Sequence, residues 1–247
     1  LSDVAAMGAA PAGFVLGLVC PDDADRNYWD AFLSGMAELA ASHDVPLVGG
    51  DLSRGDKIAV SVTVWGAPGP SSRFLTRGTG APGDILVTVG DLGLARVGLA
   101  VLEKHGRAAL ADWPAATAAH LAPVPRLAEG LSLAGLPGVT SCMDVSDGLA
   151  RDLPRLLPQG LGADLFFPPG GLHPEVTAHA AGHGRPPEKV AFFGGEDYAL
   201  LATVAPPALA ALRAAVPAAR PIGAVTAKPG CTLNGAPINE RGFDHFG

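Results

Sequence analysis

The sequence predicts an α+β fold in which helices and strands interleave along the chain and form two domains. The 247 residues are enough for one large domain or two modest ones, and a hydrophobic content of 48% supports a sizeable core. Segments with a helical spacing of apolar residues alternate with short apolar runs typical of strands. A stretch rich in glycine and proline between Gly66 and Gly83 indicates a crossover, so we expect domains at 1–67 and 77–247.

The first domain is expected to contain two helices and three strands. Ser2 or Asp3 can cap a short helix that ends at Gly8. The apolar stripe of the second helix should pack in the core, and the alternating apolar residues from Ile58 to Val64 should give a strand with one buried face. The elements are expected at 2–7 (helix), 13–19 (strand), 26–43 (helix), 45–49 (strand) and 58–64 (strand).

The second domain should contain more helices and strands, again in alternation. Pro114 should break one helix, and Pro154 should kink or shorten another. Asn234 and Gly235 predict a tight hairpin turn. Helices are expected at 94–104, 108–120, 125–136, 148–157, 174–181 and 207–216, and strands at 85–89, 139–145, 163–167, 198–204 and 221–226.

Composition restricts the classes of partner and compartment. A net charge of −7 argues against a broad nucleic-acid-binding face. The three cysteines are far apart and give no disulfide framework, which favours the cytoplasm. The apolar run from Phe14 to Cys20 is too short to cross a membrane, and no basic residue precedes it. Because the chain opens at Leu1, inside an element, we expect an N-terminal segment to precede it.

Three acidic clusters follow apolar, strand-like runs, and each stands beside glycine. Glycine allows backbone N–H groups to approach an anion, and carboxylates bind the hard cations that shield phosphate. Together the clusters predict metal-assisted handling of phosphate. They are Gly49–Asp51, Asp144–Leu149 and Gly194–Leu200.

Each cluster also has a purely structural interpretation. Ser146 or Asp147 could cap the following helix, Glu196 could belong to a charged turn, and Asp51 could do the same. Asp144 and Asp147 should lie close together, and at about 5 Å they repel by roughly 3 kcal/mol at an effective dielectric near 20. In a cleft such a pair needs a cation, and capping and metal binding can coexist.

Other motifs are less informative. Arg54 and Arg77 suit phosphate oxygens, with a solvated surface charge as the alternative for each. The segment Gly90–Leu94 could be a phosphate loop, but it lacks the GxGxxG spacing and the Walker lysine. The seven histidines show no zinc-ligand spacing, and the sequence has no GxSxG motif.

Taken together, the motifs resemble those of the thiamine-monophosphate kinase family, within the superfamily of aminoimidazole ribonucleotide synthase. The resemblance spans the chain. One departure is Ala122, which stands where the family has an arginine. The segments that carry the resemblance are Leu1–Ala9, Val48–Gly55, Leu75–Asp84, His120–Arg126, Asp144–Leu149, Gly194–Leu200 and Arg241–Phe246.

The resemblance implies the two-domain fold of that superfamily, with an N-terminal domain that binds ATP and dimerises and is truncated here. It also implies ATP-dependent phosphorylation of thiamine monophosphate to thiamine diphosphate, with no nucleic acid or membrane partner. By position, Mg²⁺ would be held by Asp3, Asp51, Asp144 and Asp147, of which Asp144 and Asp147 would be catalytic. ATP would be contacted by Gly50, Asp51, Arg77 and Ser146, and thiamine by Glu196 and Phe243.

The resemblance further implies a homodimer whose N-terminal sheets pair. Two alternatives remain open at this point. The chain could be another ATP-dependent enzyme of the superfamily, of the selenophosphate or aminoimidazole ribonucleotide synthase type. It could also be a truncated, non-catalytic protein that binds nucleotide or thiamine phosphate.

Overall fold

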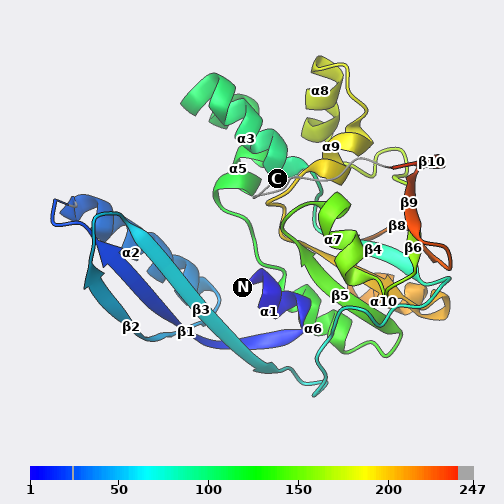
Figure 1. The fold of residues 1–247 in the computed structure, drawn as a ribbon, viewed down its shortest axis with the longest axis horizontal. Helices are drawn as coiled ribbons and strands as arrows, with labels where there is room; N and C mark the ends of the chain where they lie inside the picture. The colour runs from blue at the N-terminus through cyan, green and yellow to red at the C-terminus, as the bar shows by residue number, and fades with distance from the viewer. Residues whose placement is uncertain (24, 239–247) are drawn as a thin grey trace.

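The computed structural model describes residues 1–23 and 25–238, and these form two sheets (Figure 1). The smaller sheet has the strand order β2-β1-β3, and the larger has the order β10-β9-β6-β8-β4-β7-β5. The smaller sheet consists of β1 Ala9–Cys20, β2 Leu47–Arg54 and β3 Ala59–Pro68. The larger consists of β4 Ile85–Val89, β5 Val139–Val145, β6 Gly162–Leu165, β7 Ala199–Val204, β8 Ala219–Thr226, β9 Gly230–Leu233 and β10 Ala236–Pro237.

Most helices gather around the larger sheet, and only α2 accompanies the smaller one (Figure 1). Within the described ranges, none of them is long and apolar enough to span a bilayer. The α-helices are α1 Ser2–Ala6, α2 Arg26–Ser42, α3 Leu94–His105, α4 Ala109–Asp112, α5 Pro114–Leu121, α6 Leu127–Ala134, α7 Leu149–Leu156, α8 Pro174–Gly182, α9 Pro187–Phe193 and α10 Leu209–Ala215.

Most of the expected elements are present. The break at Pro114 is confirmed, and so is the hairpin turn, in which Asn234 and Gly235 both have positive φ. Helix α7 passes through Pro154 and ends two residues later, at Leu156. Helix α9 was not expected from the sequence.

The smaller sheet departs from the prediction that its apolar residues would be buried. Val60 and Val62 are 44% and 56% exposed, and Leu52 is 70% exposed. Helix α2 has no buried residue, so its apolar stripe does not pack in a core as expected. A sheet of three strands with one helix has too little cover for its apolar surface, because each face needs a packed layer. The expectation of a buried face is therefore wrong for the single chain.

Strands β4, β5 and β7 of the larger sheet are buried on both faces. Leu86 of β4 and Leu201 of β7 pack with helix α7, whereas Val87 and Leu200 pack on the side of α6 and α10. Consecutive residues of a strand point to opposite faces. Because both faces of β4 are packed against helices, its residues form a continuous apolar run.

Helix α1 opens the chain but belongs to the core of the larger sheet. Ala5 is fully buried there, in the same cluster as Leu200. The backbone N–H of Leu75 donates to the carbonyl of Met7 at 2.9 Å, and that of Cys142 donates to Thr76 at 3.1 Å. The loop after β3 therefore fastens α1 to the edge strand β5. This packing brings the start of the chain to the end of β5, where an acidic cluster lies.

Candidate functional site

Two loops meet at the ends of β5 and β7. The backbone N–H of Glu196 donates to the carbonyl of Ser146 at 2.7 Å, and that of Tyr198 donates to Val145 at 2.8 Å. Gly148 has φ +88°, and a Cβ on it would lie 2.3 Å from the carbonyl oxygen of Gly194. Only glycine allows the loops to approach this closely. The clusters around Asp147 and Glu196, 49 residues apart in sequence, therefore form one surface.

Asp144 and Asp3 lie close together at this surface. The Ser2 hydroxyl donates to Asp144 Oδ2 at 2.8 Å. Burial raises the pKa of the Asp144 carboxyl, the hydrogen bond from Ser2 opposes this rise, and the negative charge of Asp3 adds to it. A pair of carboxylates in which one is 9% exposed is a place where a cation would relieve repulsion.

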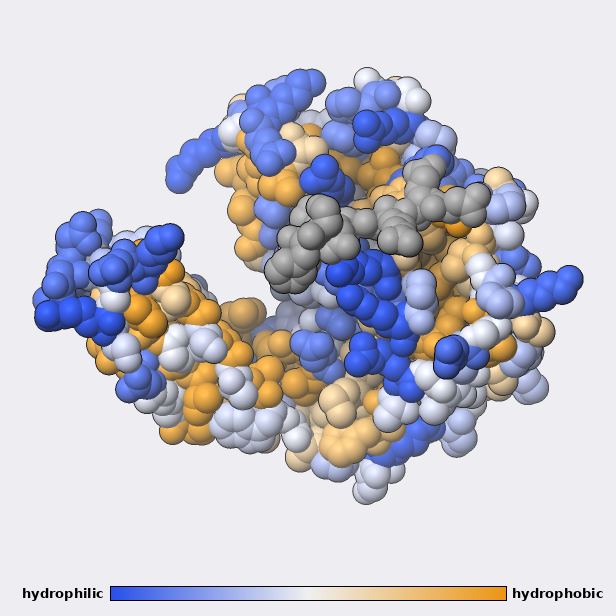
Figure 2. Space-filling view, viewed as in Figure 1, coloured by the Kyte–Doolittle hydropathy of each residue, from blue (hydrophilic) through white to orange (hydrophobic). Residues whose placement is uncertain are grey.

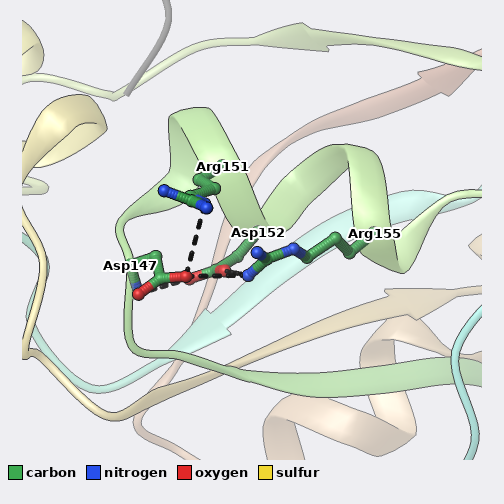
Figure 3. Close-up of polar contacts among 4 residues, drawn as sticks. All are labelled: Asp147, Arg151, Asp152 and Arg155. Atoms are coloured by element: carbon green, nitrogen blue, oxygen red, sulfur yellow. Dashed lines mark hydrogen bonds and ion pairs between the residues drawn. The ribbon is translucent and has the colours of Figure 1, made fainter. Parts of the chain in front are cut away.

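Asp147 is surrounded by two arginines of helix α7 (Figure 3). Its Oδ2 lies 2.8 Å from Nη1 of Arg155 and 3.5 Å from Nε of Arg151. These side chains rise from successive turns on one face of the helix, at spacings of four residues. Asp147 is thus already neutralised by arginine, and both guanidinium groups stand where an incoming phosphate oxygen could bind.

Asp152 stabilises the loop that carries Asp147. It is fully buried, accepts a hydrogen bond from the backbone N–H of Asp147 at 2.8 Å, and binds Arg155 Nη1 at 3.0 Å. Burial raises the pKa of its carboxyl, while the hydrogen bond from Asp147 opposes the rise. Asp152 therefore fixes both the backbone of Asp147 and the direction of one arginine that contacts it (Figure 3).

Glu196 and Tyr198 complete the surface. The Tyr198 hydroxyl donates to Glu196 Oε2 at 2.9 Å. Burial raises the pKa of Tyr198 to about 12, and the charges of Glu196, Asp144 and Asp147 act in the same direction. Both Glu196 and Tyr198 have positive φ, at 65° and 49°. Strained backbone of this kind costs about 1–3 kcal/mol for each residue and concentrates at functional sites.

The neighbouring residue Asp197 has a structural role. Its carboxylate accepts hydrogen bonds from the backbone N–H groups of Gly93 at 2.5 Å and Ala95 at 3.0 Å. It thereby caps helix α3, and the negative charge is favourable at this helix end. The segment Gly90–Leu94 thus receives a carboxylate from its own chain at the position where a phosphate loop would hold phosphate.

The other predicted residues lie elsewhere or outside the described residues. Gly50 and Asp51 lie on the exposed strand β2, and Asp51 accepts a hydrogen bond from the Ser53 hydroxyl at 2.8 Å. Arg77 is exposed in the loop that runs beside β5. Phe243 falls outside the described residues. The structure therefore brings together Asp3, Asp144, Ser146, Asp147 and Glu196, and it places Gly50 and Asp51 on the other sheet.

Sequence reasoning missed four residues of the surface. Ser2 and Tyr198 act through partners distant in sequence, which no local pattern reveals. Arg151 and Arg155 follow Asp147 at spacings of four and eight, and this helical spacing was a usable signal. In the part of the chain that the structure describes, no group of three acidic, histidine or cysteine side chains is arranged to hold a metal.

The carboxylate pair nevertheless fits magnesium. Mg²⁺ is usually bound through one or two carboxylates together with substrate phosphates and water, rather than by a cage made of protein alone. Asp3 and Asp144 supply hard oxygen ligands of this kind. The donor set of this chain therefore suits a cation that arrives with phosphate.

Comparison with known proteins places the chain in a family. Residues 1–67 match the family AIR synthase related protein, N-terminal domain, and residues 81–235 match AIR synthase related protein, C-terminal domain. A thiamine-monophosphate kinase of Synechococcus elongatus is 34% identical over 258 residues, which cover 100% of this chain and 77% of that protein. The thiamine-monophosphate kinase of Escherichia coli K12 is 35% identical over 210 residues, covering 83% of this chain and 61% of that protein.

A solved structure of "AaThiL complexed with AMPPCP and TMP" superposes with a TM-score of 0.85 at 28% identity, covering 99% of this chain and 77% of that one. The chain thus spans roughly three fifths to three quarters of the length of these relatives. Its two sheets have the architecture of that structure. The chain belongs to the thiamine-monophosphate kinase family of AIR synthase related proteins.

Proposed function

We propose that the protein phosphorylates thiamine monophosphate to thiamine diphosphate with ATP. The observation that carries the proposal is the convergence of Asp3, Asp144 and Asp147 with Glu196 at the ends of β5 and β7. The family supports the substrates, since one member was solved with AMPPCP and TMP. This surface combines carboxylates for a cation with arginines for phosphate.

The reaction is a direct in-line transfer. A terminal phosphate oxygen of thiamine monophosphate forms a bond to the γ-phosphorus of ATP, the bond to the β–γ bridging oxygen breaks, and ADP leaves. Positioning and charge neutralisation supply most of the catalysis in such transfers. No covalent nucleophile takes part.

Each residue has a definite task in this proposal. Asp3 and Asp144, with Asp147 and Asp51, would hold Mg²⁺, which would neutralise the phosphate charge. ATP is contacted by Gly50, Asp51, Arg77 and Ser146.

Thiamine monophosphate is bound by residues of the loop between α9 and β7. Glu196, which Tyr198 orients, faces the cationic thiamine body, and Phe243 stacks on one of its rings. Asp152 positions Asp147 by holding its backbone N–H.

The first experiment measures product directly. The purified protein is incubated with ATP, thiamine monophosphate and Mg²⁺, and thiamine diphosphate is quantified by chromatography. Asp144→Asn and Asp147→Asn should each lower turnover about 100-fold or more at fixed Mg²⁺, since each removes ligand charge from the transition state. Asp164→Asn, an exposed aspartate bonded to Thr232, is the matched control and should retain turnover.

Other outcomes separate the alternatives. Binding of both substrates by calorimetry without any thiamine diphosphate would favour a non-catalytic binding protein. Release of ADP only with the substrates of selenophosphate or aminoimidazole ribonucleotide synthesis would favour another enzyme of the superfamily. Normal turnover in Asp147→Asn would contradict the role given to that residue.

We also infer that a second copy of this chain covers the smaller sheet. The strand register sets Leu18 between Leu52 and Val60, with Leu16 beside Val62, so these residues share one face, on which Leu52, Val60 and Val62 are exposed and Leu16 is buried. Figure 2 shows hydrophobic atoms over this part of the molecule. Contiguous exposed apolar surface of this kind indicates an interface, and a symmetric dimer would bury it on both copies at once.

The dimer could also bring Asp51 to the site. A mixture of Asp51→Asn and Asp144→Asn tests this. If Asp51 of one copy serves Asp144 of the other, random pairing gives about a quarter of wild-type turnover, because half of the dimers regain one intact site. A mixture that stays inactive would show that each site uses its own Asp51.

A further inference from the structure

A basic hollow lies between helices α3, α8 and α9, which stand together at the top of Figure 1. Its volume is about 900 Å³. The cations that line it are Arg96, Lys104, Arg185 and Lys189, together with the histidines His105, His179 and His183, and no acidic residue is among the described residues around it. We propose that this hollow binds the diphosphate or triphosphate group of a small molecule.

Several positive groups around the hollow act on the imidazole of His179. Burial lowers the pKa of His179, and the charges of His183, Arg185, Lys104 and Arg96 lower it further. The rings of His179 and His183 are 4.3 Å apart, and the edge of Trp113 packs against His179. Cations that act on the same imidazole repel one another, so an anion among them would be stabilised by several charges together.

Three of these cations lack the usual compensation within the described residues. Across the described parts of the chain, none of Arg96, Lys104 and Arg185 forms an ion pair with a carboxylate. Arg151 and Arg155, by contrast, are both paired with Asp147. A solvated basic surface is the alternative explanation, but it does not account for a concave site or for the partly buried imidazole at its centre.

The hollow differs in charge from the candidate active site. The two regions meet near Gly194, which lines the hollow and begins the loop of Glu196. Around Glu196 lie the carboxylates of Asp144 and Asp147, the latter paired with arginine, and this acidic side of the surface suits the cationic thiamine body, whereas the hollow repels that body. Multiply charged phosphates are the small-molecule anions that arginine and lysine clusters favour. Apolar walls at Val97 and Phe193 leave room for an organic group attached to the phosphate.

The test uses calorimetry in buffer stripped of divalent cations. Without metal, the arginines around Asp147 remain paired with carboxylates, which weakens anion binding there, and the hollow variants identify the part of the anion binding that belongs to the hollow. Inorganic pyrophosphate and ADP are the two probes, used with the full chain. Arg185→Gln and Lys104→Gln should each weaken binding about tenfold, as expected for one lost charge-assisted contact. Arg107→Gln removes an exposed arginine just outside the hollow and is the matched control, with less than about a twofold change.

The outcomes are distinct. Saturable binding at one site, weakened by the hollow variants and not by the control, supports the proposal. Tighter binding of ADP would identify a nucleotide as the source of the phosphate, and tighter binding of pyrophosphate would identify a free anion. The proposal is overturned if neither probe saturates at about 10 mM, or if Arg107→Gln weakens binding as much as the hollow variants do. Unchanged melting curves would show that the variants fold. None of this depends on the proposed kinase activity.

Discussion

The carboxyl group of Asp197 should make the stability of the protein fall as pH rises from 5 to 8. Burial raises its pKa to about 7, against hydrogen bonds from Gly93 and Ala95 that oppose the rise. In the unfolded chain the same group ionises near pH 3.8. The folded state therefore retains a proton that the unfolded state has lost. The associated stability is complete below pH 3.8 and disappears as pH passes 7.

The size of the effect follows from the two pKa values. Each pH unit between them contributes about 1.4 kcal/mol, so the interval from pH 5 to pH 7 corresponds to about 3 kcal/mol. This is an upper bound, because Asp197 borders a small hollow beside Leu94 and is not wholly shielded from solvent. The value is large compared with a typical stability of 5–15 kcal/mol.

Urea denaturation at pH 5 and pH 8 measures this contribution. Asp197→Asn keeps the size of the side chain and removes its titration, so the variant should lose less stability between the two pH values than the wild type does. The raised pKa values of Asp144 and Asp152 also make stability fall as pH rises. Because both proteins contain these two groups, their contribution cancels when the variant is compared with the wild type. Asp112→Asn, an exposed aspartate at the end of α4, should behave like the wild type. An equal pH dependence in wild type and Asp197→Asn would refute the reasoning.

Three further variants test other parts of the structure. Gly148→Ala should lower the free energy of unfolding by about 2–4 kcal/mol, because its Cβ would meet the Gly194 carbonyl, whereas Gly184→Ala, with a similar positive φ in open space, should cost only about 1 kcal/mol in the same urea titration. Asp152→Asn should lower kcat about tenfold in steady-state assays, while the KM for each substrate changes less than about twofold. The reason is that the substitution loosens Asp147 without touching a substrate. Equal changes in kcat and KM would argue against a positioning role. If a second copy covers the smaller sheet as proposed, Val62→Lys should convert that dimer to a monomer in light scattering, whereas Thr63→Lys, on the opposite face of β3, should leave it intact.

Local patterns located most of the elements in the larger sheet. Strands β4 and β5 have the predicted bounds, because continuous apolar runs with sharp ends have few alternatives. Helix α9 was missed because it has seven residues and begins at Pro187, and short helices depend on packing more than on pattern. The burial of β3 was misjudged for a different reason. Alternation shows which face of a strand is apolar, and it does not show whether this chain or another one covers that face.

The site was predictable in composition and only partly in geometry. Motifs predicted Asp144, Asp147 and Glu196 as site residues, because acid beside glycine at strand ends suits metal-assisted phosphate chemistry, and the structure places them on one surface. The sequence did not reveal the hydrogen-bond partners of these acids, because Ser2 and its partner Asp144 are 142 residues apart in the chain. Such a contact depends on α1 docking against β5, which is a tertiary event.

The charge of this protein is organised locally in a way that its net charge conceals. A value of −7 describes the mean field, yet the basic hollow gathers cations without a single acidic neighbour among its described lining residues. Helix α9 forms part of that hollow and ends at Gly194, where the chain enters the acidic surface. Regions of opposite charge therefore meet within two residues of Glu196. Net charge alone argues against anion binding without metal, whereas the local distribution of charge is the basis for proposing it at the hollow.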